Sequence, residues 1–373
     1  MTLKTPLSAS RIKRLEVCSW DYWAGYHLKL PDKTNSGAVM GSCCHNLFEF
    51  LAEARHKKHY DNLVKNQNVK SCPSVDRYIS SFLIKNGFPP KDKTVSAHGE
   101  EITHEALVES MLLEGLNYDF FCNKYGKPTK SFSEIDFDID VEELDINYRV
   151  RGFIDKLFLF KDKSLAIIRD FKSSKRMFEG KEVDDNIQHQ IYELVITKLF
   201  PEYANIETEF FFMQYGKDGV LKVDKLEKQE RLGLEYHLTH IQSIVDNFNE
   251  ELALSNMAAN KGWPSSYEGF SGLVKCGRAE DPKEKKKDGS IKWSCPQKWA
   301  KHYYVLLDES EKIIASSDFK KEISKPKKGQ KIEKRFYSGC PAFRHLPYNR
   351  RIIAKETGED FEEKEVDNAS DLW

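Results

Sequence analysis

Residues 148–172 decide the fold class of this chain, and they read YRVRGFIDKLFLFKDKSLAIIRDFK. Both halves of the stretch are rich in β-branched and aromatic side chains, which favour strands, and Lys161-Asp162-Lys163 between them is typical of a turn. We therefore predict a β-hairpin. A turn centred on Asp162 places Asp155 opposite the second strand, within about one position of Asp170.

The hairpin carries side chains suited to metal-assisted chemistry. Asp170 and Lys172 are two residues apart in a strand, so both project to the same face. Carboxylate oxygens such as those of Asp155 and Asp170 bind hard divalent cations. An ammonium group orients an attacking water or neutralises charge on a phosphate. The pattern predicts metal-dependent cleavage of a phosphodiester. A surface hairpin with scattered charges remains the alternative, because Gly-x-Ile-Asp and Asp-x-Lys are short, common motifs.

Two helices are predicted on either side of the hairpin. Residues 39–52 place His45 and Glu49 one turn apart beside an apolar stripe. Residues 186–199 place Gln188 and Tyr192 one turn apart, away from an apolar face. Taken singly, His45 is as well explained as an ordinary core or surface histidine. The Gln188/Tyr192 pair is as well explained as ordinary helix surface.

In this order, the motifs Gly-x-x-x-His45, Gly-x-Ile-Asp155, Asp170-x-Lys172 and Gln188-x-x-x-Tyr192 resemble the PD-(D/E)XK nuclease superfamily. The similarity is to its RecB/AddB-like branch, which includes the iron–sulfur exonucleases of CRISPR adaptation, and it runs from about residue 7 to about residue 215. The resemblance implies an α/β fold, with a mixed central sheet flanked by helices, a helical N-terminal region and a Cys-containing C-terminal lobe. It also implies roles for individual residues: Mg²⁺ or Mn²⁺ ligation by His45, Asp155, Asp170 and the carbonyl of Phe171, catalysis by Lys172, and DNA contact or bracing by Gln188 and Tyr192.

The resemblance sets the expected function. The histidine accompanies exonuclease action on single-stranded DNA ends in this branch, so we expect a DNA exonuclease in recombination, repair or processing. A structure-specific endonuclease is the second expectation. Two further classes of protein stay open: a catalytically silent nuclease fold that binds DNA or acts as a scaffold, and a metal-stapled protein that binds a helicase or recombination protein.

Four of the eight cysteines form a second candidate site. Cys295 and Cys340 each precede a proline, a pairing frequent around iron–sulfur clusters because the ring stiffens the loop. In the AddB-like branch, one N-terminal and three C-terminal cysteines hold a four-iron cluster. Cys18, Cys276, Cys295 and Cys340 resemble that set, which implies a [4Fe–4S] cluster.

The spacing of these cysteines departs from the family pattern. The family's C-terminal cysteines are closely spaced, whereas Cys276, Cys295 and Cys340 are separated by long intervals here. Four thiolates bind zinc equally well. Unrelated free thiols remain a third possibility. Because no apolar signal region or membrane-length apolar run is visible, we expect a cytoplasmic protein, in host cytoplasm if the source is viral, without disulfides or membrane contact.

Composition agrees with a large globular enzyme. The chain has 373 residues, is 40% hydrophobic and carries a formal net charge of −1, so its overall charge neither favours nor excludes nucleic acid. Residues 281–298 and 319–335 are strongly basic, and Trp293 or Trp299 offers a stacking surface beside them. The tail from Glu356 to Asp371 is acidic.

The expected organisation has three parts. Residues 1–130 are predicted to be the helical N-terminal part of the nuclease domain, with a helix near 8–28. Residues 131–220 form the catalytic core, in the order strand–strand–strand–helix–strand. Residues 221–373 contain a long helix at 225–258 and a Cys-rich, Lys-rich lobe with strands at 301–307 and 311–316.

Overall fold

The computed structural model describes residues 4–32, 35–260 and 275–359. Much of the predicted acidic tail therefore lies outside the described residues. Across these three ranges, no helix combines the length and apolar character needed to cross a membrane.

The chain divides into two compact units, and each is assembled from two separate segments. Unit 1 comprises residues 1–10 and 34–246, and unit 2 comprises residues 11–33 and 247–373. The residues predicted to bind a divalent metal all belong to unit 1. The four cysteines predicted to form a cluster all belong to unit 2.

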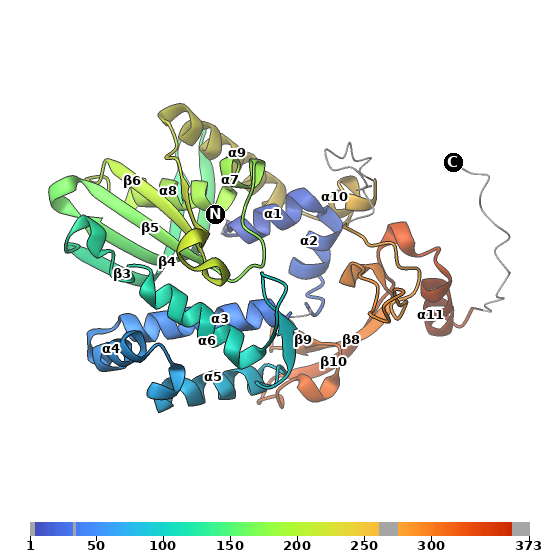
Figure 1. Ribbon diagram of the computed structural model, residues 1–373. Helices are drawn as coiled ribbons and strands as arrows, with labels where there is room; N and C mark the ends of the chain where they lie inside the picture. The colour runs from blue at the N-terminus through green and yellow to red at the C-terminus, as the bar shows by residue number, and fades with distance from the viewer. Residues whose placement is uncertain (1–3, 33–34, 261–274, 360–373) are drawn as a thin grey trace. The chain divides into compact units, whose positions relative to one another are not determined.

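Unit 1 is built on a five-stranded mixed sheet in the order β3-β4-β5-β6-β7 within the described residues (Figure 1). Neighbouring strands are antiparallel except for β5 and β6, which are parallel. A small antiparallel pair, β1 and β2, lies apart from this sheet. The strands span Lys93–Val95 (β1), Glu101–Thr103 (β2), Lys130–Glu142 (β3), Asn147–Phe160 (β4), Leu165–Lys172 (β5), Asn205–Phe212 (β6) and Val220–Val223 (β7).

Helices cover both faces of the sheet (Figure 1). On one face, α3 to α6 share a hydrophobic cluster with Phe171 of β5 and Phe211 of β6. On the other face, α8 reaches Asp170 and Lys172 of β5, and α9 packs along β4. The helices span Ser36–Ala52 (α3), Lys57–Asn66 (α4), Pro73–Lys85 (α5), His104–Asn117 (α6), Lys181–Asp184 (α7), Ile187–Leu199 (α8) and Lys228–Asp246 (α9).

The predicted hairpin is confirmed as β4 and β5. Lys156 pairs with Arg169, one position from Asp155 and Asp170, and the turn is a short 3₁₀ helix at Lys161–Lys163. Every residue of β5 from Leu165 to Phe171 is buried. Such a run is typical of a central strand covered on both faces.

Side-chain caps fix where the two site-bearing helices begin. The Asn35 side chain accepts a hydrogen bond from the amide of Ala38 at the start of α3. Asn186 accepts hydrogen bonds from the amides of Gln188 and His189 at the start of α8. Each cap satisfies amides that have no partner within the helix, and so fixes the start of the helices that present His45 and Gln188.

Unit 2 contains a three-stranded antiparallel sheet in the order β10-β8-β9. The helix predicted near residues 8–28 is instead two helices, because Cys18 is extended between them, with φ −159°. The two strands predicted in this lobe are confirmed, whereas β10 and α11 were not predicted. The elements span Ala9–Val17 (α1), Ser19–Tyr26 (α2), Glu250–Ser255 (α10), Lys301–Leu307 (β8), Ile313–Ser317 (β9), Lys331–Tyr337 (β10) and Pro347–Thr357 (α11).

Candidate active site

Asp155 and Asp170 lie where β4 and β5 stop pairing. The ladder between these strands ends at Lys156 and Arg169, while β5 continues to pair with β6 as far as Lys172. Beyond the Lys156–Arg169 pair, the amide of Phe171 donates to the side-chain Oδ2 of Asp155 over 2.7 Å instead of to the backbone of β4. Because the two strands diverge here, the Asp155 side chain takes the place of a backbone partner, and the Asp155 and Asp170 carboxylates lie next to each other.

His45 reaches this carboxylate pair from α3. Its Nδ1 lies 3.2 Å from Asp155 Oδ1. Burial disfavours the charged imidazole, but Asp155 and Asp170 outweigh it and raise the pKa of His45 above its usual value. His45 and Asp155 line a cavity of about 200 Å³ together with Ser42, Asn46, Phe48, Glu49, Glu134 and Phe171.

Lys172, Gln188 and Tyr192 complete a network around Asp170. Lys172 Nζ lies 2.6 Å from Asp170 Oδ2 and donates to Gln188 Oε1 over 2.7 Å. The Gln188 amide donates to Asp170 Oδ1 and to the Tyr192 hydroxyl, over 2.7 and 2.6 Å. The Gln188/Tyr192 pair predicted on one helix turn therefore holds both the carboxylate and the lysine in place.

Asp170 is the most buried of these charged groups, with 2% of its surface exposed. Burial raises the pKa of its carboxyl to about 6, although Lys172 acts in the opposite direction. Apart from the Lys172 ion pair, Oδ2 has no partner among the described residues. A buried carboxylate oxygen with one partner is suited to a bound cation.

The donor set fits a divalent metal, but the side chains are not closed around one. Across the described ranges, no three His, Cys, Asp or Glu side chains converge closely enough to enclose an ion. Asp155, Asp170 and His45 nevertheless offer the oxygen and imidazole donors that Mg²⁺ or Mn²⁺ accepts. Small side-chain rotations are therefore needed for ligation. Phe171 follows Asp170 in β5 and its amide contacts Asp155, and its carbonyl as a ligand stays a prediction.

Glu134 is a member of this cavity that the sequence did not single out. It is skipped in the ladder between β3 and β4, where it lies opposite Asp155, and its φ of 50° is unusual for a residue with a side chain. Burial and a hydrogen bond to Glu49 raise the pKa of the Glu134 carboxyl. The i,i+4 relation of Glu49 to His45 was visible in the sequence, whereas the irregularity at Glu134 was not.

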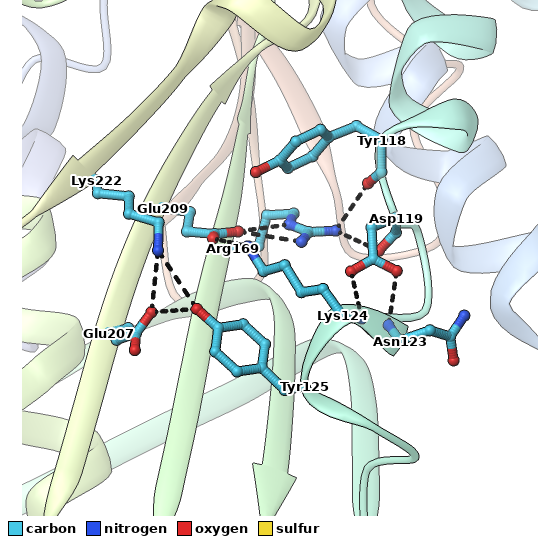
Figure 2. A network of polar contacts seen from close by, with 9 residues as sticks. All are labelled: Tyr118, Asp119, Asn123, Lys124, Tyr125, Arg169, Glu207, Glu209 and Lys222. Carbon is cyan, nitrogen blue, oxygen red and sulfur yellow. Dashed lines mark hydrogen bonds and ion pairs between the residues drawn. The ribbon is translucent and has the colours of Figure 1, made fainter.

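On the face of β5 opposite Asp170, a buried ion pair ties β5 to β6 (Figure 2). Arg169 and Glu209 are direct partners in the parallel ladder, and both are 0% exposed. Two Arg169 nitrogens lie 3.1 Å from Glu209 Oε2, and Lys124 donates to Glu209 Oε1 over 2.6 Å. Arg169 also donates to the carbonyls of Tyr118 and Asp119 after α6.

The charge state of this pair follows from its neighbours. Burial favours the neutral form of Glu209, but Arg169 and Lys124 outweigh it and lower the pKa of the carboxyl. The pair is thus fully charged where water has no access. It fixes the register of the strand whose next residue is Asp170.

The four cysteines predicted to form a cluster line one cavity in unit 2. The cavity has a volume of about 480 Å³ and includes Cys18, Cys276, Cys295 and Cys340 in its wall. The amide of Cys295 donates to the carbonyl of Cys276 over 3.0 Å. Burial raises the pKa of three C-terminal thiols, to about 11 for Cys276 and about 12 for Cys295 and Cys340.

The remaining predictions for unit 2 have mixed outcomes. All eight cysteines are free thiols. Cys43, Cys44, Cys72 and Cys122 are buried in unit 1 and do not line the cavity. Trp293 is 57% exposed, as a stacking surface requires. Trp299 is only 7% exposed and donates to Ser294, so the suggestion that it stacks on nucleic acid is wrong.

Comparisons with known proteins give one extended match. A family model described as the PD-(D/E)XK nuclease superfamily matches residues 6–260. No curated protein matches the chain. Among solved structures, one described as "Crystal structure of SSO0001" is 10% identical, with a TM-score of 0.23, and covers 62% of this chain and 86% of that one. Another, "Crystal structure of protein VC1899 from Vibrio cholerae", is 13% identical, with a TM-score of 0.20, and covers 67% of this chain and 58% of that one.

Proposed function

The chain belongs to the PD-(D/E)XK nuclease superfamily, and from that membership we propose that it is a divalent-metal-dependent deoxyribonuclease acting on single-stranded ends. The observation that carries the proposal is the gathering of His45, Asp155, Asp170 and Lys172 in one place. A metal-dependent nuclease uses this combination of ligands and a cation, whereas a DNA-binding scaffold has no use for a half-buried lysine paired with a buried carboxylate.

The roles of the residues follow from their contacts. His45, Asp155 and Asp170, with the carbonyl of Phe171, would hold Mg²⁺ or Mn²⁺. When bound, such an ion supplies Lewis acidity and lowers the pKa of a coordinated water. Lys172, fixed by Asp170 and Gln188, places its ammonium group where it can orient water or balance charge on the phosphate.

Gln188 and Tyr192 are positioning residues in this proposal. Gln188 contacts Lys172, Asp170 and Tyr192 at once, so it sets the distance between the carboxylate and the ammonium group. The Tyr192 hydroxyl accepts from Gln188 and lies 3.4 Å from Asp170 Oδ1. Direct contact of either residue with DNA remains part of the proposal.

Cleavage of end-labelled DNA tests the exonuclease assignment. We expect linear single-stranded DNA to be degraded in Mg²⁺ or Mn²⁺ and left intact in EDTA, with slower loss of the matching duplex, because a single-stranded end is the proposed substrate. Circular single-stranded DNA of the same sequence is the control and should persist. Equal cleavage of the circle would instead establish an endonuclease, and no cleavage with either metal would leave a DNA-binding scaffold.

We further propose that Cys18, Cys276, Cys295 and Cys340 hold a [4Fe–4S] cluster, with Zn²⁺ as the alternative. Their common place in one cavity wall supports this assignment. Thiols with raised pKa values are poor free nucleophiles, but a metal displaces their protons outright. The cluster would join the segment before α2 to the C-terminal lobe within unit 2.

Metal analysis after anaerobic purification separates the two metals. We expect iron and sulfide with broad absorbance near roughly 400 nm, and loss of most of the metal together with a lower melting temperature in Cys340→Ser. Cys72→Ser is a matched control, because Cys72 already contacts His59 and Ser74, which accept a hydroxyl. Zinc in place of iron would select the alternative, and wild-type protein without either metal would contradict both.

A further inference from the structure

Three cationic side chains surround one tyrosine ring on α2 of unit 2. Arg11 Cζ lies 4.4 Å from the centroid of the Tyr26 ring. Lys29 Nζ and Arg14 Cζ both lie 5.8 Å from the same centroid. A single cation–aromatic contact is weak at an exposed site. Three around one ring concentrate positive charge next to an aromatic face.

Arg14 and Lys29 have different charged neighbours. Arg14 is held by two carboxylates, Asp21 at 2.8 Å and Asp32 at 3.0 Å. Lys29 is exposed, and burial together with Arg11 and Lys312 lowers the pKa of its ammonium group. The neighbours that act on Lys29 are thus other cations, and a bound anion would relieve their repulsion.

A stacked pair of rings, Trp23 and His27, lies beside Tyr26 in the sequence. Trp23 and His27 are stacked, with centroids 4.5 Å apart and planes at 18°. Trp23 is half-buried, whereas His27 is exposed and forms the outer ring of the pair. Burial, Lys29 and Arg11 lower the pKa of His27, so the ring is neutral at pH 7.5.

We propose that the α2 surface, formed by Trp23 and Tyr26 of α2 together with Arg11 of α1 and with His27 and Lys29 just after α2, binds a single-stranded nucleic acid. Arg11 and Lys29 contact consecutive phosphates, and the neutral ring of His27 offers a face on which an unpaired base stacks. Bases in a duplex have no free faces, so the combination of cations and rings favours a single strand. The inference deepens the proposed function, since it assigns a binding surface for its substrate outside unit 1.

Two variants separate the charges from the ring. Fluorescence anisotropy of a labelled twenty-nucleotide oligothymidylate is measured with the full-length, anaerobically purified protein over a series of salt concentrations. No Mg²⁺ or Mn²⁺ is added, so that the oligonucleotide stays intact. Arg11→Gln/Lys29→Gln should weaken binding about tenfold or more and reduce the slope of log Kd against log salt by about 1.4, the value for two phosphates of a single strand. His27→Ala should weaken binding about tenfold and leave the slope unchanged, because it removes a stacking face but no charge.

A matched double variant controls for net charge. Arg351→Gln/Lys355→Gln also removes two exposed cations from unit 2, outside both basic stretches. Arg351 lies 5.8 Å from the ring of Tyr348, and this control should leave both the affinity and the slope at wild-type values. Melting temperature confirms that each variant is folded. Equal weakening by this control, or a wild-type slope and affinity in Arg11→Gln/Lys29→Gln, would overturn the proposal.

Binding and cleavage test the surface and the active site separately. If the wild-type protein binds but never cleaves DNA, and the variants of the α2 surface lose binding, the result supports the surface and contradicts the nuclease proposal. If the wild-type protein cleaves DNA and the variants of the α2 surface bind like wild type, the result contradicts the proposed surface and does not affect the nuclease proposal. Equally tight binding of the duplex, with the same response to His27→Ala, would exclude base stacking and so overturn the inference.

Discussion

Replacing Asp170 by asparagine should slow DNA cleavage by about 10³-fold or more, which corresponds to several kcal/mol of lost metal-assisted stabilisation of the transition state. Asparagine keeps the size of the side chain, and its oxygen can still accept from Gln188. The negative charge that pairs with Lys172, and that we propose binds the cation, is lost. The measurement is the single-turnover rate on end-labelled single-stranded DNA in Mg²⁺ and Mn²⁺.

Stability should not fall with activity in this variant. Burial raises the pKa of Asp170 from 3.8 to about 6. The folded protein therefore holds this proton more tightly than the unfolded chain, and stability decreases as pH rises through the interval between these values. At pH 7.5 in EDTA the carboxylate is a net cost to the metal-free fold, so Asp170→Asn should melt at or above the wild-type temperature.

The control for Asp170 lies in the same hairpin. Asp162→Asn changes an exposed residue of the turn between β4 and β5 and should cleave DNA at the wild-type rate. Cleavage by Asp170→Asn within tenfold of wild type, in either metal, would remove Asp170 from the active site. A large loss of melting temperature would mean that the lost activity reflects unfolding.

Breaking the buried pair shown in Figure 2 should have the largest effect on stability. Arg169→Met leaves Glu209 buried and charged, and Glu209→Gln leaves Arg169 in the same condition. Removing one partner of such a pair typically costs about 3–5 kcal/mol. Each single variant should therefore lower the urea midpoint of unfolding markedly.

The double variant and an exposed pair complete this experiment. Arg169→Met/Glu209→Met removes both buried charges together and should recover a large part of the loss, because the one cation that loses its partner, Lys124, is 33% exposed and can be hydrated. Lys222 and Glu207 form a neighbouring pair whose side chains are 57% and 39% exposed. Glu207→Gln should cost less than about 1 kcal/mol. Single variants of the buried pair with wild-type midpoints would show that β5 and β6 are held by other contacts.

The local sequence pattern was sufficient to predict the parts of the site whose residues lie close together in the sequence. The alternation and turn of residues 148–172 predicted the hairpin, and the turn-by-turn spacing of His45/Glu49 and Gln188/Tyr192 predicted their helices. These features depend on the periods of strands and helices, which a short sequence records directly.

Other features depend on contacts that no local pattern records. The strand Lys331–Tyr337 lies in a Lys-rich stretch whose alternation is mostly polar, so its composition suggested a loop. The Arg169–Glu209 pair joins strands separated by a helix, and the two residues are not distinguishable from surface charges in the sequence. The meeting of Cys18 with the C-terminal cysteines depends on the fold of unit 2 and was available only through the resemblance.

The discontinuous make-up of unit 2 has a consequence for biosynthesis. Residues 11–33 leave the ribosome well before residue 247, where their packing partners begin. At about 5–20 residues per second, this early segment waits for roughly ten to forty seconds. Its aromatic side chains, Trp20, Tyr22 and Trp23 among them, remain available to chaperones throughout that interval, while the whole of residues 34–246 can fold before they are covered.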